Sequence, residues 1–250
     1  MIIFNNSKLH IVIILMIQFF MGIYMAAVRL VNTDGQSFLT LFFNAKDGEG
    51  LDITSGQFDL NLIISVLNII VSVPLIMPLF YKKYLTKCCY ISTRQRKYFV
   101  FYSREIFNIF IICILSEVLY HAGIAAVAAV KCDSVLDNSC AIELIVMSVI
   151  NSVFIIFTAA LIGSVFSVLF GKKTSVLIMV AAVTALSVMI FFIPSEYKQF
   201  NIMTWYFTDK FADNKTIFPY PFYSYYAAAA GTDILLFLSG GYILKKRDVI

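Results

Sequence analysis

The chain has 250 residues, of which 60% are apolar and 14% are charged, and its mean hydropathy is +0.87. A soluble domain is nearer half apolar and a quarter charged, and a water-soluble chain of this length could not bury so much apolar surface. The net charge of +4 is modest, and no basic cluster lies within polar sequence. Composition and charge therefore exclude a soluble globular protein and disfavour nucleic acid as a partner.

Six apolar stretches are long enough to cross a bilayer as helices, which takes about 20 residues each. In chain order these stretches span residues 9–31, 60–80, 106–130, 142–170, 174–193 and 223–244. The first stretch is longer than the core of a cleaved signal peptide, so we expect it to remain as a span. The sequence therefore predicts an all-α integral membrane protein in which residues 1–250 form one domain of six transmembrane helices.

The connecting segments predict the orientation, because short cytoplasmic loops carry an excess of Lys and Arg. Both chain ends, the loop 81–104 and the turn 171–173 are basic. The loops 32–59, 131–141 and 194–222 instead mix acids with lysines. Six crossings place every basic segment on one side, so both termini are predicted to lie in the cytoplasm.

The third predicted span contains Glu117 and His121, which are four residues apart and so share one face of a helix. An ionisable side chain in hydrocarbon is costly and is a functional hypothesis by default. The pair could relay protons or line a pathway, or it could be a hydrogen-bonded pair that locks the bundle. A zinc site needs three or four ligands, and the only other histidine, His10, begins the first span at its inner end. No metal site is therefore predicted.

The sixth predicted span contains a lone acid, Asp233. We expect it to face the bundle interior, where it could line a pathway, or a subunit interface, because facing lipid would be too costly. The same span has small residues at 227–231 and 239–241, which let helices approach closely. They could serve either packing within the chain or contact between subunits.

Two cysteines, Cys132 and Cys140, fall in the same short outer loop. A disulfide that closes this loop is chemically reasonable on the oxidising side of a membrane. The alternative is two free thiols, and the sequence leaves both open.

No motif for catalysis or nucleotide binding is found in the sequence. The turn Gly171-Lys172-Lys173-Thr174 lacks the upstream glycine that a phosphate-binding loop requires. Neither a Gly-x-Ser-x-Gly nor a His-Glu-x-x-His motif occurs. We therefore assign no catalytic residue, and energised work would need a partner chain or an ion gradient.

The segment 81–105 is the most distinctive part of the chain, because basic and apolar residues alternate in a way that suits a helix at the membrane surface. Its element Ser92-Thr93-Arg94-Gln95-Arg96-Lys97-Tyr98, closing on Tyr102-Ser103-Arg104, is similar to the basic segment between spans two and three of ABC-2 permeases. The turn 164–176, the outer stretch 199–205 and the ending 241–249 resemble the corresponding parts of that family. The chain thus resembles small six-span permease subunits of ABC-2 transporters, more narrowly those for bacterial peptide or bacteriocin export and self-immunity.

The resemblance implies an ABC-2 (type V exporter-like) permease fold in the bacterial cytoplasmic membrane. Two permease subunits, identical or related, would form the pathway, and two separate ABC ATPase subunits would dock beneath them and bind ATP and Mg²⁺. The cargo would be an amphipathic peptide or another lipid-soluble toxin, and this chain would bind no cofactor itself. The docking loop would comprise Thr93, Arg94, Gln95, Arg96, Lys97 and Tyr98.

Two further features of the resemblance concern the outer and N-terminal segments. Family members place short helices that dip back toward the membrane between spans five and six, where this chain has residues 199–205. This chain departs from the family at its start, because the eight residues before the first span leave little room for an interfacial helix.

A proton-coupled secondary transporter that uses Glu117 and His121 is the alternative prediction. It would work without an ATPase and would lose its activity on Glu117→Gln. No inverted repeat is evident in the sequence, which disfavours this class. A membrane sensor or assembly factor is a third possibility that the sequence neither supports nor excludes.

Overall fold

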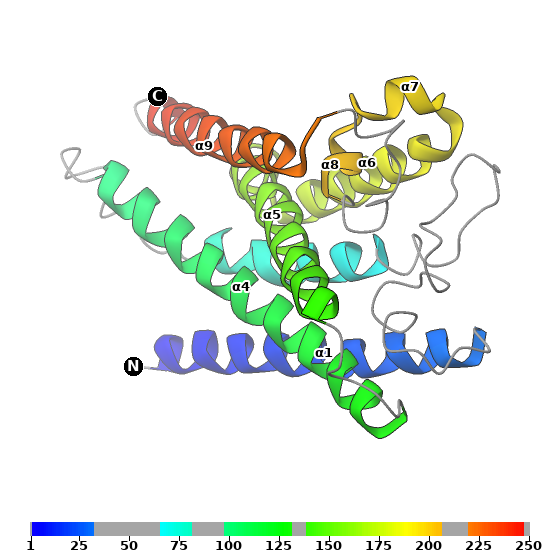
Figure 1. Ribbon diagram of the computed structural model, residues 1–250. Helices are drawn as coiled ribbons and strands as arrows, with labels where there is room; N and C mark the ends of the chain where they lie inside the picture. Colours follow the sequence, from blue (N-terminus) through cyan, green and yellow to red (C-terminus); the bar gives the residue numbers. More distant parts are fainter. Residues whose placement is uncertain (1, 33–65, 82–97, 132–138, 207–219, 248–250) are drawn as a thin grey trace.

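The computed structural model describes residues 2–32, 66–81, 98–131, 139–206 and 220–247, and every regular element in these ranges is helical. The longer helices are α1 (Ile2–Asn32), α4 (Tyr98–Lys131), α5 (Ser139–Phe170), α6 (Lys172–Phe192) and α9 (Phe222–Arg247). Two short helices, α7 (Ser195–Lys198) and α8 (Ile202–Tyr206), lie between α6 and α9. A further apolar helix, Val66–Tyr81, is drawn in cyan and without a label in Figure 1.

Five described helices are long and apolar enough to cross a membrane, namely α1, α4, α5, α6 and α9. The helix Val66–Tyr81 is apolar but shorter, and residues 60–65 of the predicted second span lie outside the described part of the chain. The prediction of an all-α integral membrane protein is confirmed. The chain is a multi-pass membrane protein with at least five helices that can span.

The central helix of the described part is α5 (Figure 1). It packs against α4, α6, α8 and α9, while α1 packs along α4. Buried residues make up 67% of the most apolar stretch of α5. The same share is 28% for the most apolar stretch in each of α1, α6 and α9. The peripheral helices therefore present most of their surface to the surroundings.

The two ends of the chain lie on the same side of the bundle. In Figure 1 the first turn of α1, the start of α4 and the last turn of α9 all lie at the left. The ends of α4 and α9 on this side carry exposed basic residues, Arg104 on α4 and Lys245 and Lys246 on α9. The side with both chain ends is therefore also a basic side.

The outward surface of α1 is apolar. Leu9, Met16, Phe20 and Tyr24 follow one another at helical spacing and are 54–64% exposed. The interior instead contains many polar side chains, among them Gln18, Asn68, Glu117, His121, Asn151, Thr158 and Asp233. Large exposed apolar faces are unfavourable in water, whereas buried polar side chains commonly join helices in lipid. Both observations agree with lipid as the solvent.

The connection between α5 and α6 is a single residue, Gly171, with φ 84° and ψ 158°. This combination of angles is essentially restricted to glycine. The Gly171 carbonyl accepts a hydrogen bond from the Ser175 N–H at 3.1 Å, and the Ser175 hydroxyl donates to the Gly163 carbonyl of α5 at 2.9 Å. The predicted turn at 171–173 is therefore present, with α6 already begun at Lys172.

The ends of some helices differ from the predictions. α4 begins at Tyr98, before the predicted third span 106–130, so the last part of the connecting segment 81–104 is helix. With 34 residues, α4 is about 51 Å long, longer than the roughly 30 Å hydrocarbon core. Its first two turns contain Ser103, Arg104 and Glu105, which lower the hydropathy without ending the helix.

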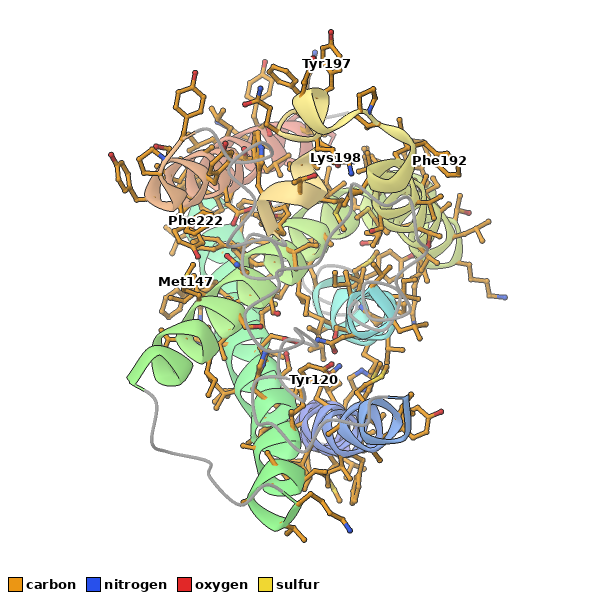
Figure 2. All side chains as sticks on the ribbon, turned by 45° about the vertical axis from the view of Figure 1, so that its right-hand side comes forward. Tyr120, Met147, Phe192, Tyr197, Lys198 and Phe222 are labelled. Carbon is orange, nitrogen blue, oxygen red and sulfur yellow. The ribbon has the colours of Figure 1, made fainter. Side chains whose placement is uncertain are left out.

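α1 and α4 cross at two glycines, Gly22 and Gly123. A Cβ atom added to Gly22 would collide with the Tyr120 carbonyl, and one added to Gly123 would collide with the Phe19 carbonyl. Figure 2 shows Tyr120 where α4 meets α1. The backbones of the two helices are therefore in direct contact, as small residues permit in membrane helix pairs.

Candidate functional site

Glu117 on α4 is the centre of a buried hydrogen-bond network. The side-chain amide of Asn68, on the helix Val66–Tyr81, donates to both carboxyl oxygens of Glu117 at 3.2 and 3.1 Å. Ser152 on α5 donates to the same carboxyl group. Glu117 is fully buried and Asn68 is nearly so. The carboxyl group therefore has partners from two neighbouring helices, as a polar group within a membrane span requires.

The network continues from Asn68 to α1. The Ser72 hydroxyl donates to the Asn68 carbonyl at 2.7 Å and lies 3.3 Å from Asn68 Oδ1. The side-chain amide of Gln18, on α1, donates to Ser72 Oγ at 2.8 Å. A continuous row of polar contacts thus joins α1, the helix Val66–Tyr81 and α4 inside the bundle.

His121 extends the network toward α5. Its Nδ1 lies 2.9 Å from the Glu117 main-chain carbonyl oxygen, which can only accept, so Nδ1 carries the proton. Its Nε2 lies 3.3 Å from Ser148 Oγ on α5. Nδ1 is also 3.9 Å from Glu117 Oε2. The structure therefore brings the two predicted residues together, while their role in transport stays a prediction.

A second polar cluster surrounds Asp233 on α9. Oγ1 of Thr158, on α5, lies 2.5 Å from Asp233 Oδ1 and 2.6 Å from the hydroxyl of Tyr206 on α8. All three side chains are buried. Asp233 thus faces the interior of the bundle, one of the two positions predicted for it, and its cluster joins α5, α8 and α9.

Cys113 on α4 lies within electrostatic reach of both acids, Glu117 and Asp233. It is fully buried and is a free thiol. Among the described residues, no three His, Cys, Asp or Glu side chains gather closely enough to hold a metal ion. His10 is on α1, where its Nε2 lies 3.3 Å from the Leu75 carbonyl oxygen.

Several predicted site residues lie outside the described part of the chain. Of the predicted docking loop, residues 93–97 are not described, and Tyr98 is the first residue of α4. Cys132 is also not described, while Cys140 belongs to the first turn of α5 rather than to a loop. The docking loop and the disulfide therefore stay predictions.

The segment between α6 and α9 folds onto the bundle. The Asn201 side chain donates to the Leu186 carbonyl of α6 at 2.9 Å, and its Oδ1 accepts from the Met203 N–H at 3.0 Å. Asn201 therefore both caps α8 and fixes it to α6. α8 also packs against α5 and α9, with Met203, Thr204 and Tyr206 buried.

α7 has one outward and one inward side. Figure 2 shows Tyr197 at the edge of the molecule and Lys198 on its inward side. Lys198 is only 4% exposed, and burial lowers the pKa of its ammonium group. Lys198 is therefore a titratable group close to α8.

The small residues of α9 divide between two environments. A Cβ atom on Gly240 would lie 2.6 Å from the hydroxyl oxygen of Tyr102 and 2.8 Å from Val165 Cγ2, whereas one on Gly231 would meet nothing within 4 Å. The Tyr102 ring in turn stacks on Phe237 at 5.2 Å. Gly240 and Gly241 therefore serve packing within the chain, whereas Ser239 is exposed and Gly231 faces open space.

Sequence reasoning singled out the ionisable residues but missed their neutral partners. Asn68, Ser72, Gln18, Thr158 and Tyr206 are polar side chains of types that occur in many membrane spans. Their positions relative to Glu117 and Asp233 depend on how each helix is rotated about its axis. The one signal that could have found some of them is the pair Asn68 and Ser72, which lie four residues apart on one helical face.

The comparisons with known proteins add no further identification. The chain was compared with protein-family models, with curated proteins and with solved structures, and no match was found. The ABC-2 resemblance therefore rests on the sequence features given above, and the fold rests on the helices and contacts described here.

Proposed function

We propose that the chain is the transmembrane permease subunit of an ATP-driven exporter of the ABC-2 class. Two copies, or one copy and a related permease, form the pathway, and separate ATPase subunits bind ATP and Mg²⁺. The cargo is an amphipathic peptide or a similar lipid-soluble toxin. The chain crosses the bacterial cytoplasmic membrane six times, with the helix Val66–Tyr81 as part of the second span and both termini in the cytoplasm.

The pair of short helices between α6 and α9 is the observation that carries this proposal. The resemblance implies such helices at this place in the chain, and α7 and α8 occupy it. α8 packs against α5, α6 and α9. A connection of this kind suits the outer mouth of a pathway formed by the longer helices.

The two helices that flank the basic segment 82–97 are held together at two levels. Asn68 and Glu117 join them within the bundle. Nearer the segment, the rings of Phe80 and Tyr102 meet edge to face at 6.1 Å. A force applied to residues 82–97 would therefore move both helices as a unit.

This mechanical arrangement provides a route from ATP to the pathway. Closure of the ATPase subunits would displace the segment 82–97, and the two flanking helices would tilt against α5 and α9. The equilibrium between inward-open and outward-open states would shift because the ATPase contacts differ between them. No residue of this chain takes part in ATP hydrolysis in this mechanism.

Affinity purification tests the proposal. The tagged chain is extracted from its native membrane in mild detergent, and the co-purifying proteins are identified by mass spectrometry. We expect an ABC ATPase subunit to co-purify, and to be lost from the triple variant Arg94→Glu, Arg96→Glu, Lys97→Glu.

The matched control is Lys172→Glu, Lys173→Glu, Lys246→Glu, which makes the same charge reversal at three exposed basic residues elsewhere in the chain and should retain the ATPase. Recovery of the wild-type chain alone, under conditions that keep another transporter complex intact, would contradict the proposal. Retention of the ATPase by the 94/96/97 variant would contradict the docking site.

A proton-coupled carrier is the second candidate, and the buried Glu117–His121 network favours it. A buried carboxyl group 3.9 Å from an imidazole inside a membrane span is the type of site that binds and releases protons. This candidate predicts transport without an ATPase and loss of transport in Glu117→Gln. The ATP-driven exporter predicts that Glu117→Gln, which keeps an oxygen for Asn68, continues to transport.

A further inference from the structure

Thr158 on α5 is the hub of three short polar contacts. Its Oγ1 lies 2.9 Å from the Phe154 carbonyl oxygen, 2.6 Å from the Tyr206 hydroxyl and 2.5 Å from Asp233 Oδ1. Thr158, Tyr206 and Asp233 are between 4% and 6% exposed. One buried hydroxyl group therefore connects α5, α8 and α9.

Three hydrogen bonds at one oxygen need three protons. Thr158 and Tyr206 each supply one hydroxyl proton. The Phe154 carbonyl can only accept, so it takes the Thr158 proton, and the Tyr206 hydroxyl then donates to Thr158 Oγ1. The contact between Asp233 Oδ1 and Thr158 Oγ1 has a proton of its own only when Asp233 is a neutral carboxylic acid that donates it.

An ionised Asp233 fits the surroundings poorly. It would take the single Thr158 proton, and its second oxygen, Oδ2, has no hydrogen-bond partner in the described part of the chain. A buried carboxylate without a paired cation is costly. The nearest basic residue along α9 in the C-terminal direction, Lys245, is about 18 Å further along the helix axis at 1.5 Å per residue.

Within the described part of the chain, the titratable neighbours of Asp233 do not provide a cation either. They are Tyr206 on α8 and Cys113 on α4, both within electrostatic reach, and Cys113 is in turn within electrostatic reach of Glu117. α9 itself contributes Tyr225 and Tyr226 about two turns earlier. The described side chains of α5, residues 145–170, include no charged group.

We infer that Asp233 is a proton-binding site, and that its bound proton holds α8 against α5 and α9. When the proton leaves to solvent, Thr158 turns its hydroxyl proton from Phe154 to the carboxylate, and a negative charge remains in apolar surroundings. The charge is stabilised only if water or a cation reaches it, which requires α8 to move away from Asp233. Proton release thus frees α8 from α5 and α9, whether or not an ATPase drives transport.

The chain contains a fluorescent residue whose emission reports on the surroundings of α8. Its only tryptophan, Trp205, lies on α8, where the indole N–H donates to the Gln199 carbonyl at 2.6 Å. Emission of Trp205 and its quenching by acrylamide are measured on the purified full chain from about pH 4 to 9, a range that covers buried carboxyl groups. The wild-type chain should show one transition, with a red-shifted emission and stronger quenching at high pH.

Two variants assign the transition. In Asp233→Asn the amide N–H can still donate to Thr158 and cannot be lost as a proton, so the low-pH signal should persist at every pH. Glu117→Gln removes another buried acid and should keep the wild-type transition. A wild-type signal that does not change with pH, or an Asp233→Asn variant that titrates like the wild type, would overturn the inference; the second result would assign the transition to a group other than Asp233.

Infrared spectroscopy keeps the inference testable if Asp233→Asn does not fold. The wild-type chain at low pH should show the C=O stretching band of a hydrogen-bonded carboxylic acid. This band should shift in Thr158→Val, which removes the hydroxyl partner, and should remain in Glu117→Gln. Absence of a carboxylic-acid band that responds to Thr158→Val would show that Asp233 does not hold the proton.

Discussion

Asn68 shows how a single neutral residue can fix the geometry of a buried carboxyl group in the membrane. Its side-chain amide donates hydrogen bonds to both carboxyl oxygens of Glu117 on another helix. Its main-chain carbonyl accepts a hydrogen bond from the Ser72 hydroxyl. Hydrogen bonds between membrane helices are worth less than the low dielectric suggests, about 0.6 kcal/mol on average and 1.7 at most. The Asn68–Glu117 contact is therefore expected to fix geometry as much as stability.

A double-mutant cycle between Asn68→Ala and Glu117→Ala tests this contact. We expect a coupling free energy of about 0.6–1.7 kcal/mol, because each single change removes the same hydrogen-bonded contact between the two buried groups. The measurement is unfolding of the purified chain in mixed detergent micelles.

The control cycle pairs Asn68→Ala with Ser187→Ala. Ser187 is buried but donates to the Val183 carbonyl of its own helix. Here the two effects should add to within about 0.5 kcal/mol. Equal coupling in both cycles would mean that the Asn68–Glu117 contact is not specific.

At the scale of helices, the crossing of α1 and α4 depends on backbone contact. A Cβ atom on Gly123 would lie 3.0 Å from the Ile23 nitrogen and 3.2 Å from Gly22 Cα, besides its collision with Phe19. These are backbone atoms, so the clash can be relieved only if the two helices separate. A Cβ atom added to Gly231 on α9 would instead meet no atom within 4 Å.

The same substitution at these two glycines should therefore have opposite effects. We expect Gly123→Ala to destabilise the chain by about 1–3 kcal/mol, as overpacking does. Gly231→Ala should be neutral or stabilising by up to about 1 kcal/mol, because alanine has less freedom in the unfolded chain. Unfolding in mixed micelles measures both, and equal losses of stability would contradict the crossing described for α1 and α4.

The one-residue turn between α5 and α6 gives a second prediction at this scale. Gly171 has a backbone conformation that costs other residues about 1–3 kcal/mol, so Gly171→Ala should lower the free energy of unfolding by that amount. The neighbouring change Lys172→Ala, at an exposed position, should stay within about 0.5 kcal/mol of the wild type. A Gly171→Ala variant as stable as the wild type would show that α6 can begin differently.

Long apolar blocks made most of the helices predictable, because lipid requires about 20 apolar residues per span. Hydropathy marks the length in contact with lipid and not the ends of a helix, which is why the first turns of α4, with Arg104 and Glu105, fell outside the predicted third span 106–130. Glu117, His121 and Asp233 were found because charge is rare in hydrocarbon. Their partners Asn68 and Thr158 could not be predicted, since helix rotation is set by packing between segments distant in sequence.

In the whole molecule, each of the two polar clusters joins helices that would move if the bundle changed conformation. The Glu117 cluster joins the helices that flank the basic segment 82–97, and the Asp233 cluster joins α5 and α9 to α8. Cys113 lies within reach of both acids. A displacement that begins at the basic segment could therefore reach α8 through α4 and α5.

Transport into inside-out membrane vesicles tests the central claim most directly. Vesicles that contain the chain and its co-purified partners are given a fluorescent amphipathic peptide, with ATP or with an imposed pH gradient, and with or without a protonophore. We predict that accumulation requires ATP, persists with the protonophore and is lost in the variant Arg94→Glu, Arg96→Glu, Lys97→Glu. Accumulation driven by the pH gradient without ATP, and abolished by Glu117→Gln, would contradict the ATP-driven exporter and identify a proton-coupled carrier.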